Sequence, residues 1–308
     1  MKNSIDVSII IVSYNTKDLL RSCVESVIKN ITHLKYEIII VDNNSGDGSK
    51  LYINNIAKKY KNVKCFFMDK NIGFGGANNF GMNKSTGKYI LLLNSDILIE
   101  NNVVERVVQW MNINSGYGVA SANLYNPDGS IQGTGGYFPT IFSVFSWMTI
   151  QDLPFVDNLI KPFHPMKGNS PFSNRAFYYK ERDLDWVTGA FFMMRREVFE
   201  KVGGFDTDFF MYTEEVEYCV RIKAQDWLVR YLPYEGVIHL GGASGNTGDS
   251  ILKEFEGVKL LYKKHYPRWQ YPIMRVILKI GCLWRMFLMG IIKGRKAGSI
   301  YAKAFFKT

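Results

Sequence analysis

The amino-terminal part of the chain alternates between unbroken apolar runs and segments whose apolar residues recur at helical spacing. The runs VSIIIVSYN, YEIIIVD, VKCFFM and KYILLLNSD predict buried strands, with helices after the first strand and over residues 50–59. Buried strands that alternate with helices are typical of a parallel sheet covered by helices on both faces. The fold class indicated is therefore α/β.

Three of these runs end in a polar residue, namely Asn15, Asp42 and Asp96. The carboxyl ends of parallel strands meet at one edge of a sheet, and ligands bind beyond that edge. We therefore expect the three side chains to line one site. The alternative for Asp96 is the N-cap of a helix that begins near Glu100, and for Asp42 a role in the turn that NNSG forms.

A segment rich in glycine and asparagine, NIGFGGANN, follows the third run and is expected to be a loop that leads into a helix. Its glycines, Gly73, Gly75 and Gly76, lack the GxGxxG spacing, and the segment does not follow the first strand. Both features argue against a dinucleotide-binding dehydrogenase.

The second half of the chain has a less regular pattern. NPDGS predicts a turn with a hairpin, DWVTGAFFMMRREVF a strand that leads into a helix, and EEVEYCVRIKAQ a helix. LVRYLPYEGVIHLGG predicts a pair of short strands that ends at His239. Residues 137–183 are rich in Phe and Pro without a clear period, and no element is assigned to them.

Helical phase separates the acidic residues of EEVEYCVRIKAQ. At about 100° per residue Glu214, Glu217 and Arg221 share one side, and the Glu217–Arg221 spacing is typical of a solvated face. Glu215 falls on the apolar side, where a carboxylate is costly unless it is paired or functional. Burial would raise its pKa, which suits a general base. The alternative is a structural role, in which Glu215 accepts backbone N–H bonds or pairs with a buried arginine.

His239 ends a short apolar strand and precedes a glycine-rich polar segment. Together with Asp96 it could complete a divalent-cation site. Mg²⁺ and Mn²⁺ take carboxylates, phosphate oxygens and water, and Mn²⁺ also accepts imidazole. A purely structural histidine is the alternative.

Composition and charge narrow the class of protein. The chain has 308 residues, 47% hydrophobic and 21% charged, which indicates a large folded core and argues against general disorder. The net charge of +10 is concentrated in the tail, because twelve Lys and Arg and no Asp or Glu follow Gly257, which leaves −2 for the rest. A nucleic-acid-binding domain would need a basic stripe on its folded body, so we expect no nucleic-acid partner.

The cysteines and the amino-terminus indicate a compartment. The four cysteines are widely spaced without a CxxC pair, which argues against a disulfide framework or a zinc site. The apolar run near the amino-terminus is too short for a signal peptide. We therefore expect a cytoplasmic protein with reduced thiols.

The tail segment IMRVILKIGCLWRMFLMGIIKGRK is apolar but interrupted by basic residues, and its longest uncharged run, Met286–Ile292, has seven residues. Crossing a bilayer takes roughly 20. On a helical wheel Arg275, Lys279 and Lys293 fall within about 40°, with Arg285 about 80° away. The segment therefore predicts a basic amphipathic helix that lies on an anionic membrane surface. The alternative is a core-packing helix with a solvated basic edge.

Several motifs in order resemble family 2 glycosyltransferases, and most closely their bacterial rhamnosyltransferase-like members. They are VSIIIVSYN, EIIIVDNNSGDGS, NIGFGGANNFGMNKSTGKYILLLNSD, DWVTGAFFMMRREVFEKVGGFD, FFMYTEEVEYCVRIK and VIHLGGAS, and they span roughly residues 5–245. The resemblance implies a GT-A fold, with a mixed sheet flanked by helices. It also implies a nucleotide-diphosphate sugar donor (dTDP- or UDP-linked), a divalent cation (Mn²⁺ or Mg²⁺) and inversion of the anomeric centre. We expect a glycosyltransferase domain over residues 1–250 and a helical, membrane-associating segment over 251–308.

The resemblance also implies roles in nucleotide-sugar binding. Asp42 resembles the residue that reads the base, Tyr14 and Asn15 would line the nucleotide pocket, and Asn71 and Gly73 would approach the ribose and diphosphate. The other residues implied in donor binding are Asn78, Asn94 and Ser95.

For catalysis, Glu215 resembles the base of the family's ED motif, with Glu214 beside it. Asp96 resembles the last residue of the D-x-D motif, and His239 the second metal ligand. The acceptor and donor-sugar pocket is implied to include Trp186 and Gly189. Two positions depart from the family pattern: Asn94 stands for the first aspartate of D-x-D, and the ED pair is two glutamates.

The function expected is inverting transfer of a sugar, with rhamnose suggested by the family, to a hydroxyl of a saccharide acceptor. The basic tail suits a polyprenyl-diphosphate-linked acceptor in cell-surface polysaccharide synthesis, on the inner face of the plasma membrane. A nucleotidyltransferase is an alternative, although SYNTKD stands where its glycine-rich phosphate loop would be. A membrane-associated sugar-nucleotide-binding protein without activity is another, against which the joint presence of Asp96, Glu215 and His239 argues.

Overall fold

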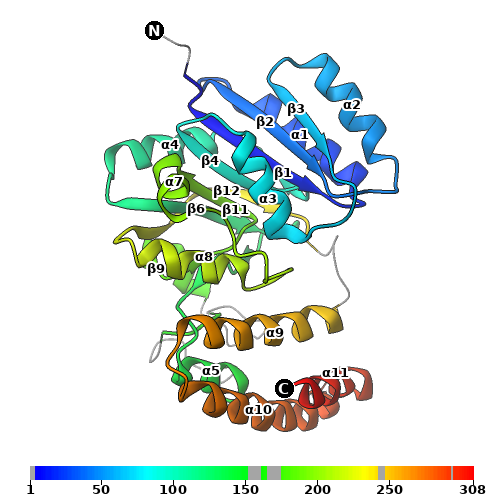
Figure 1. Cartoon of the computed structure of the whole chain (residues 1–308), viewed down its shortest axis with the longest axis vertical. Helices are drawn as coiled ribbons and strands as arrows, with labels where there is room; N and C mark the ends of the chain where they lie inside the picture. Colours follow the sequence, from blue (N-terminus) through cyan, green and yellow to red (C-terminus); the bar gives the residue numbers. More distant parts are fainter. Residues whose placement is uncertain (1–3, 152–160, 165–174, 242–246, 293) are drawn as a thin grey trace.

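The computed structural model describes residues 4–151, 161–164, 175–241, 247–292 and 294–308. Within them a twisted ten-stranded sheet is the central layer (Figure 1). Its main order is β3 (Val63–Phe67), β2 (Tyr36–Asp42), β1 (Val7–Ser13), β4 (Tyr89–Asn94), β11 (Phe191–Arg195), β6 (Tyr117–Tyr125), β12 (Leu228–His239) and β5 (Ile97–Leu98). At the side, β7 (Ile131–Gln132) pairs with β6 and β9 (Arg182–Leu184) with β12, while β8 (Gly135–Gly136) and β10 (Trp186–Val187) form a separate pair.

The four apolar runs of the amino-terminal part form the parallel half of the sheet, as the sequence predicts. β1 pairs in parallel with β2 and β4, and β2 pairs in parallel with β3. From β11 onward the sheet is mixed, because β11 runs antiparallel between β4 and β6. A mixed sheet flanked by helices is the architecture that the resemblance implied.

Both faces of the sheet are covered, because successive side chains of each strand point to opposite faces. Ile9 and Ile11 belong to the hydrophobic cluster built with α1 (Lys17–Asn30), α2 (Ser49–Lys59) and α4 (Val103–Ile113). Ile10 belongs to the cluster on the other face. The helices that contribute to this second cluster include α3 (Gly73–Lys84), α7 (Arg196–Val202) and α8 (Glu214–Lys223).

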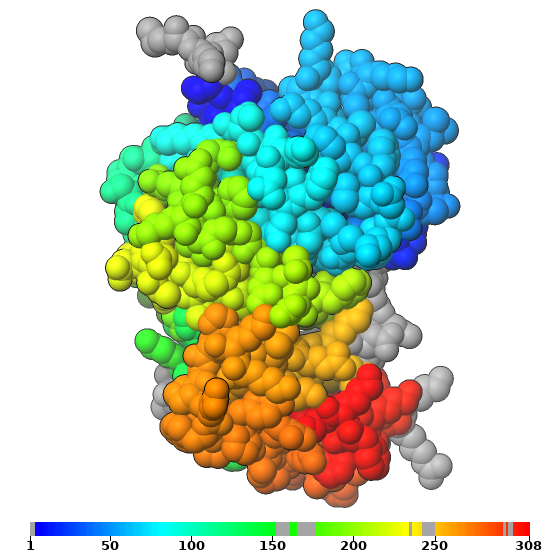
Figure 2. Space-filling model, in the orientation of Figure 1, coloured from blue at the N-terminus to red at the C-terminus, as the bar shows by residue number. Residues whose placement is uncertain are grey.

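A helical layer extends the second face at one end of the molecule. It consists of α5 (Ile141–Met148), α9 (Thr247–His265), α10 (Gln270–Ile292) and α11 (Arg295–Lys307). Figure 1 shows α9 between the sheet and α10, with α5 and α11 beside α10. Met274, Leu278 and Cys282 of α10 are fully buried in the cluster that also contains Ile10. The tail therefore packs on the folded body, which Figure 2 shows as one orange and red block at that end.

Two expectations for local structure change, and one unassigned segment gains elements. The glycine-rich segment leads into a helix as predicted, but its glycines lie within the helix, because α3 begins at Gly73 and includes Gly75 and Gly76. The predicted pair of short strands is one strand, β12, with irregular register between Leu232 and Val237. Residues 137–183, which had no assignment, contain α5, a short 3₁₀ helix (Arg175–Tyr179) and part of β9 in their described portions.

The charged residues of α10 are not arranged as the helical wheel suggested. Arg285 is buried, and its guanidinium donates to the carbonyls of Trp147 and Met148 at the end of α5. It therefore caps α5, whose last carbonyls have no partner inside the helix. Arg275 donates to the carbonyl of Thr308 at 2.7 Å, and Lys293 lies outside the described residues.

Among the described residues, no helix combines the length and the apolar character that crossing a bilayer requires.

Candidate active site

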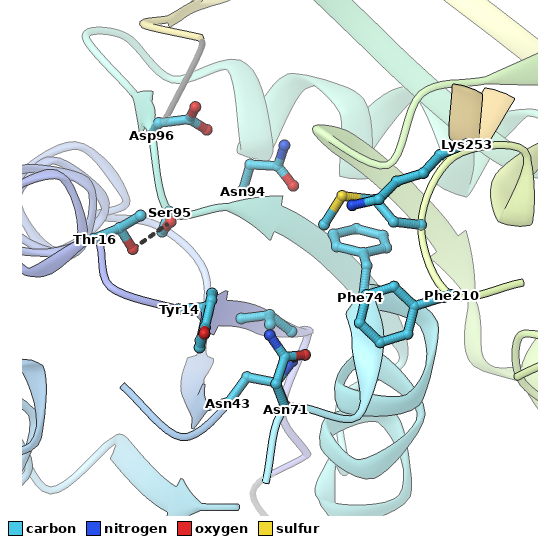
Figure 3. A pocket seen from close by; sticks show the side chains of 12 residues that line it. Tyr14, Thr16, Asn43, Asn71, Phe74, Asn94, Ser95, Asp96, Phe210 and Lys253 are labelled. Atoms are coloured by element: carbon cyan, nitrogen blue, oxygen red, sulfur yellow. Dashed lines mark hydrogen bonds between the residues drawn. The ribbon is translucent and has the colours of Figure 1, made fainter. Parts of the chain in front are cut away.

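A pocket opens at the carboxyl ends of β1, β2 and β4, where the sequence predicts a site. Its cavity volume is about 270 Å³. Figure 3 shows its lining from several segments of the chain. The lining residues are Val12, Tyr14, Thr16, Asn43, Asn71, Phe74, Asn94, Ser95, Asp96, Phe210, Met211 and Lys253.

Five of the residues implied in donor or metal binding line this pocket: Tyr14, Asn71, Asn94, Ser95 and Asp96. The others lie outside the lining: Asn15, Asp42, Gly73, Asn78, Trp186, Gly189, Glu214, Glu215 and His239.

Hydrogen bonds between asparagine side chains shape the pocket floor. Asn43 donates to Asn71 Oδ1 at 2.9 Å and to the Gly73 carbonyl at 3.1 Å, and it accepts from the Ile72 N–H at 3.0 Å. Gly73 has φ +79°, and a Cβ there would lie 2.7 Å from the Phe210 carbonyl. Only glycine fits this left-handed, crowded position. Asn43 was not predicted, although the doubled asparagine after Asp42 was its signal in the sequence.

Two other residues implied in donor binding, Asn78 of α3 and Asp42 at the end of β2, lie behind the residues that line the pocket. Asn78 is buried and donates to the Phe74 carbonyl at 3.0 Å, which fixes the start of α3. Asp42 is fully buried, and its Oδ2 accepts the Ser45 N–H at 3.1 Å, so the turn role is present. Its Oδ1 is buried without a hydrogen-bond partner. A buried unpaired carboxylate oxygen is costly, which makes it a candidate acceptor for a ligand donor.

Asp96 and His239 meet across the sheet edge, as the sequence predicts. Asp96 lies in the turn between β4 and β5, and His239 ends β12, where it pairs with Ile97 of β5. His239 Nε2 lies 3.3 Å from Asp96 Oδ1. The helix-capping alternative for Asp96 is wrong, since α4 begins at Val103 and its N-cap is Asn102.

The pair fits a hard divalent cation. Two ligands at adjacent corners of an octahedron with bonds of about 2.1 Å lie roughly 3.0 Å apart, close to the separation of these two atoms. Among the described residues no group of three or more His, Cys, Asp or Glu could hold a metal. A cation held here would therefore take its remaining ligands from a bound substrate and water, as Mg²⁺ does at phosphate sites.

The two consecutive glutamates stand after a strained turn. Tyr212 and Thr213 have φ +68° and +71°, the left-handed region that non-glycine residues rarely adopt. Such strain is retained where the surroundings fix it, often at functional sites. α8 begins directly after this turn, so Glu214 and Glu215 occupy its first two positions.

Burial raises the pKa of both Glu214 and Glu215. Glu215 is only half-buried, yet its Oε2 is enclosed without a hydrogen-bond partner, and desolvation raises its pKa to about 7. Hydrogen bonds from backbone N–H groups, including that of Gly189, act in the opposite direction. Burial, with repulsion from Glu215 second, also raises the pKa of Glu214 well above its ordinary value.

The expected solvated face of α8 is wrong. Glu217 is 1% exposed and Glu214 4% exposed. Arg221 forms a bidentate pair with Glu217 at 2.7 and 2.8 Å, and His265 of α9 lies 3.0 Å from Glu217. The reason is that His265 of α9 contacts Glu217 and backbone carbonyls at the end of α7 accept from Arg221, so the ion pair is an internal contact.

Of Trp186 and Gly189, the contacts connect Gly189 to the pocket wall. Trp186 is buried, and its indole N–H donates to the Tyr137 carbonyl at 3.2 Å. A Cβ on Gly189 would lie 2.9 Å from the Phe74 ring. Phe74 lines the pocket, and Gly189 is hydrogen-bonded to Glu215. These contacts place Glu215 next to the pocket wall at Phe74.

Lys253 is a pocket residue that sequence reasoning missed. It comes from α9 and is the single cation among the residues that line the pocket (Figure 3). Its Nζ lies 5.9 Å from the Phe210 ring centroid. No local signal distinguishes it from the many other lysines of the tail, because only the packing of α9 against the Tyr212–Thr213 turn brings it here.

Comparisons with known proteins agree with this geometry. The family model described as Glycosyl transferase family 2 matches residues 8–203. The chain is 24% identical over 241 residues to the rhamnosyltransferase WbbL of Escherichia coli, covering 76% of this chain and 83% of that protein. It is also 24% identical over 220 residues to N-acetylglucosaminyl-diphospho-decaprenol L-rhamnosyltransferase of Mycobacterium tuberculosis, covering 68% of this chain and 67% of that protein.

Two solved structures share the fold. The mannosyltransferase PcManGT from Pyrobaculum calidifontis, in complex with GDP-Man and Mn²⁺, has a TM-score of 0.60 and 13% identity, covering 99% of this chain and 87% of that chain. GalNAc-T7 with UDP, GalNAc and Mn²⁺ has a TM-score of 0.60 and 19% identity. It covers 86% of this chain, which spans about half, 49%, of the GalNAc-T7 chain. At these identities the likeness shows the fold alone.

Proposed function

The chain belongs to glycosyl transferase family 2, as a rhamnosyltransferase-like member with a GT-A fold, and from this premise we propose a specific reaction. The enzyme transfers a sugar, rhamnose by family resemblance, from a nucleotide-diphosphate donor to a saccharide hydroxyl with inversion. The acceptor is lipid-linked, and the product contributes to a cell-surface polysaccharide. The decaprenol-linked acceptor in the name of the mycobacterial relative supports this acceptor class.

The observation that carries the proposal is the arrangement at the pocket. Asp96 and His239 meet at 3.3 Å beside a cavity whose floor is built from the ends of β1, β2 and β4. Glu215, with a pKa raised to about 7, lies at the Phe74 side of the same cavity. Single-displacement sugar transfer needs ligands for a metal ion and a general base, and these two groups and a carboxylate with a raised pKa stand beside one pocket.

The protein's own groups perform two tasks. Asp96 and His239 would hold the divalent cation, which supplies neutralisation of the charge that grows on the departing diphosphate. Glu215 accepts the proton of the acceptor hydroxyl as the hydroxyl oxygen attacks the anomeric carbon. Because no residue at the site is assigned as a covalent nucleophile, one displacement takes place and the anomeric configuration inverts.

Donor recognition is assigned to residues that line the pocket or lie behind its floor. Asp42 Oδ1, buried and unpaired, would accept the imide N–H of a uracil or thymine base. Tyr14, Asn15 and Asn71 would enclose the nucleotide, and Lys253 would contact a diphosphate oxygen. A lysine ammonium near a phosphate forms a charge-assisted hydrogen bond.

The surface of α10 supports membrane association. One side of this helix exposes large apolar side chains over its whole length, within about 100° of a helical wheel. The residues are Ile273, Val276, Ile280, Leu283, Trp284, Phe287 and Ile291. We name this set the α10 apolar face. A contiguous exposed apolar surface of this kind marks a contact with a protein or a membrane.

The charges of the tail favour an anionic membrane as the contact of the α10 apolar face. Arg275 of α10 is exposed although it donates to the Thr308 carbonyl, Lys279 is half-buried, and Lys303 of α11 is exposed. No acidic residue follows Gly257. An apolar face flanked by cations lies in the interface of anionic lipids, as interfacial helices do. We therefore place the enzyme peripherally on the inner face of the plasma membrane, within reach of a polyprenyl-linked acceptor.

The proposal is tested by transfer and binding assays on the purified protein. A panel of dTDP-, UDP- and GDP-sugars is offered with Mn²⁺, with Mg²⁺ and with EDTA, and release of the nucleoside diphosphate is measured. We expect metal-dependent turnover with one donor, its loss in Glu215→Gln with donor binding retained, and loss of the metal dependence in Asp96→Ala. Transfer by Glu215→Gln at the wild-type rate would contradict the assigned base.

A further inference from the structure

A chain of hydrogen bonds behind His239 determines which nitrogen of its ring carries the proton. The Oε1 atom of Gln132, in β7, lies 2.8 Å from His239 Nδ1. The Nε2 atom of Gln132 donates to the His239 carbonyl at 2.9 Å. The same Nε2 donates to Asn126 Oδ1 at 2.6 Å. The side-chain amide of Gln132 therefore bridges the ring and the backbone of one residue.

The orientation of the Gln132 amide is fixed by chemistry. A backbone carbonyl only accepts hydrogen bonds, so the atom of Gln132 next to the His239 carbonyl must be the NH₂ group. The reversed orientation would place two acceptor oxygens against each other at both the His239 carbonyl and Asn126 Oδ1. The amide oxygen consequently faces His239 Nδ1, which must then donate.

A second, independent route gives the same orientation. The carboxylate of Asp128, which is exposed, accepts from Ser130 Oγ at 2.6 Å, so the Ser130 hydroxyl is the donor. Ser130 Oγ then accepts from Asn126 Nδ2 at 2.8 Å, which leaves Asn126 Oδ1 to accept from Gln132. The NPDGS turn between β6 and β7 therefore fixes which atom donates and which accepts in each hydrogen bond that leads to His239.

We infer that Gln132 is a positioning residue that holds His239 with its ring proton on Nδ1, so that the Nε2 lone pair faces Asp96 as a metal ligand. With the proton on Nδ1, a neutral His239 ring presents an acceptor nitrogen to an acceptor oxygen at 3.3 Å. Two acceptors at this distance repel each other unless a cation lies between them. Hydrogen bonds behind a ligating histidine fix its tautomer in this way and raise its basicity.

This inference rests on the proposed metal-binding role of Asp96 and His239. It concerns a residue, Gln132, that neither lines the pocket nor belongs to any motif of the resemblance. It also gives a function to the β6–β7 hairpin, whose second strand pairs with the end of β6 outside the main strand order.

The first test needs no variant, because the tautomer can be read in the wild-type protein. The chain contains four histidines, and ¹⁵N-histidine labelling with long-range proton–nitrogen correlation separates the two neutral tautomers. A His239→Ala spectrum identifies the signal of His239. At alkaline pH without metal we expect the proton on Nδ1. A His239 ring with its proton on Nε2 overturns the inference.

The second test measures Mn²⁺ affinity by electron paramagnetic resonance titration. Gln132→Leu removes the acceptor, and we expect a mixture of tautomers and about 10- to 100-fold weaker Mn²⁺ binding. Gln132→Glu keeps an oxygen opposite Nδ1 but loses the two bonds that Nε2 donates, and we expect it to retain the Nδ1 proton and to bind Mn²⁺ more tightly than Gln132→Leu although more weakly than the wild type. Gln109→Leu, an exposed glutamine of α4, is the matched control for loss of a glutamine.

The outcomes separate the two claims. A folded Gln132→Leu protein whose Mn²⁺ affinity is within twofold of wild type overturns the role of Gln132 and leaves the proposed reaction intact. Sugar transfer by a wild-type protein that binds no Mn²⁺ overturns the metal role itself, and the inference with it. If Gln132→Leu unfolds, the wild-type spectrum and Gln132→Glu still decide.

Discussion

The α10 apolar face offers a quantitative test of membrane association. Ile280 and Phe287 lie near its centre and are 54% and 65% exposed, so each places more than half of its side chain against solvent. We predict that the double variant Ile280→Ser/Phe287→Ser binds anionic vesicles much more weakly than the wild type. Its folding stability should change little, because neither side chain is part of the buried core.

The magnitude follows from the exposed fractions. Complete burial of an Ile or Phe side chain contributes about 1.5–3 kcal/mol. Scaled by the exposed fractions of Ile280 and Phe287, transfer of both into the lipid interface contributes roughly 2–3.5 kcal/mol. Their loss should weaken partitioning by about 30- to 300-fold, since 1.4 kcal/mol corresponds to a factor of 10.

The assay is co-sedimentation with vesicles of phosphatidylcholine alone and of phosphatidylcholine with phosphatidylglycerol. Leu51→Ser/Ile113→Ser is the matched control, because these residues are 69% and 83% exposed on α2 and α4 and lie off the α10 face. We expect the control to bind like the wild type, and binding to fall when salt screens the flanking cations. Equal binding by the α10 variant and the control would refute the reasoning.

Three further predictions concern the pocket and its support. Because burial raises the pKa of Glu215 to about 7, kcat/KM should rise with pH through this value, whereas the stability that its protonated form contributes falls as the pH rises above the ordinary value of 4.5 and is fully lost above about pH 7; a pH-independent rate with folding intact would exclude Glu215 as the base. Lys253→Met should weaken binding of a nucleoside diphosphate about tenfold and leave nucleoside binding unchanged. Both affinities are measured by calorimetry, with Lys263→Met, which is exposed on the same helix, as the control. Equal loss of affinity for both ligands would rule out a diphosphate contact. Gly257→Ala should reduce the rate of sugar transfer, because its Cβ would overlap Thr213 Oγ1 and displace the turn before Glu214. The loss is expected even though alanine stabilises a helix by about 1 kcal/mol relative to glycine. An unchanged rate with a raised melting temperature would show that the turn moves without harm to catalysis.

The parallel half of the sheet could be predicted from the sequence because its signals are local. Each strand is an unbroken apolar run, and Asp42 and Asp96 stand where the runs stop, so the edge that carries the pocket follows from topology alone. The insertion of β11 between β4 and β6 could not be predicted in this way. It depends on antiparallel pairing between Phe191–Arg195 and two segments that lie about 100 and about 75 residues earlier in the chain.

The errors on the helices have one physical cause. Periodicity shows which sides of a helix differ, but not what covers them. Glu217 and Arg221 have the spacing of a surface pair, yet His265 of α9 contacts Glu217 and carbonyls at the end of α7 accept from Arg221, so the pair is an internal contact. Arg285 has the sequence context of a membrane-facing cation, yet its guanidinium donates to a carbonyl at the end of α5. Lys253 shows the reverse, an ordinary tail lysine that α9 brings into the pocket.

Lys253 also bears on the substitution of Asn94 in the D-x-D position. Asp96 is the one carboxylate and Lys253 the one cation among the residues that line the pocket. A nucleotide-sugar diphosphate carries about two negative charges, which a divalent cation balances, and the remaining protein charges then balance each other. A second aspartate in place of Asn94 would leave one negative charge uncompensated in a partly enclosed site, where such a charge is costly. The asparagine is therefore consistent with a cation supplied from α9, and Lys253 links the tail to the pocket.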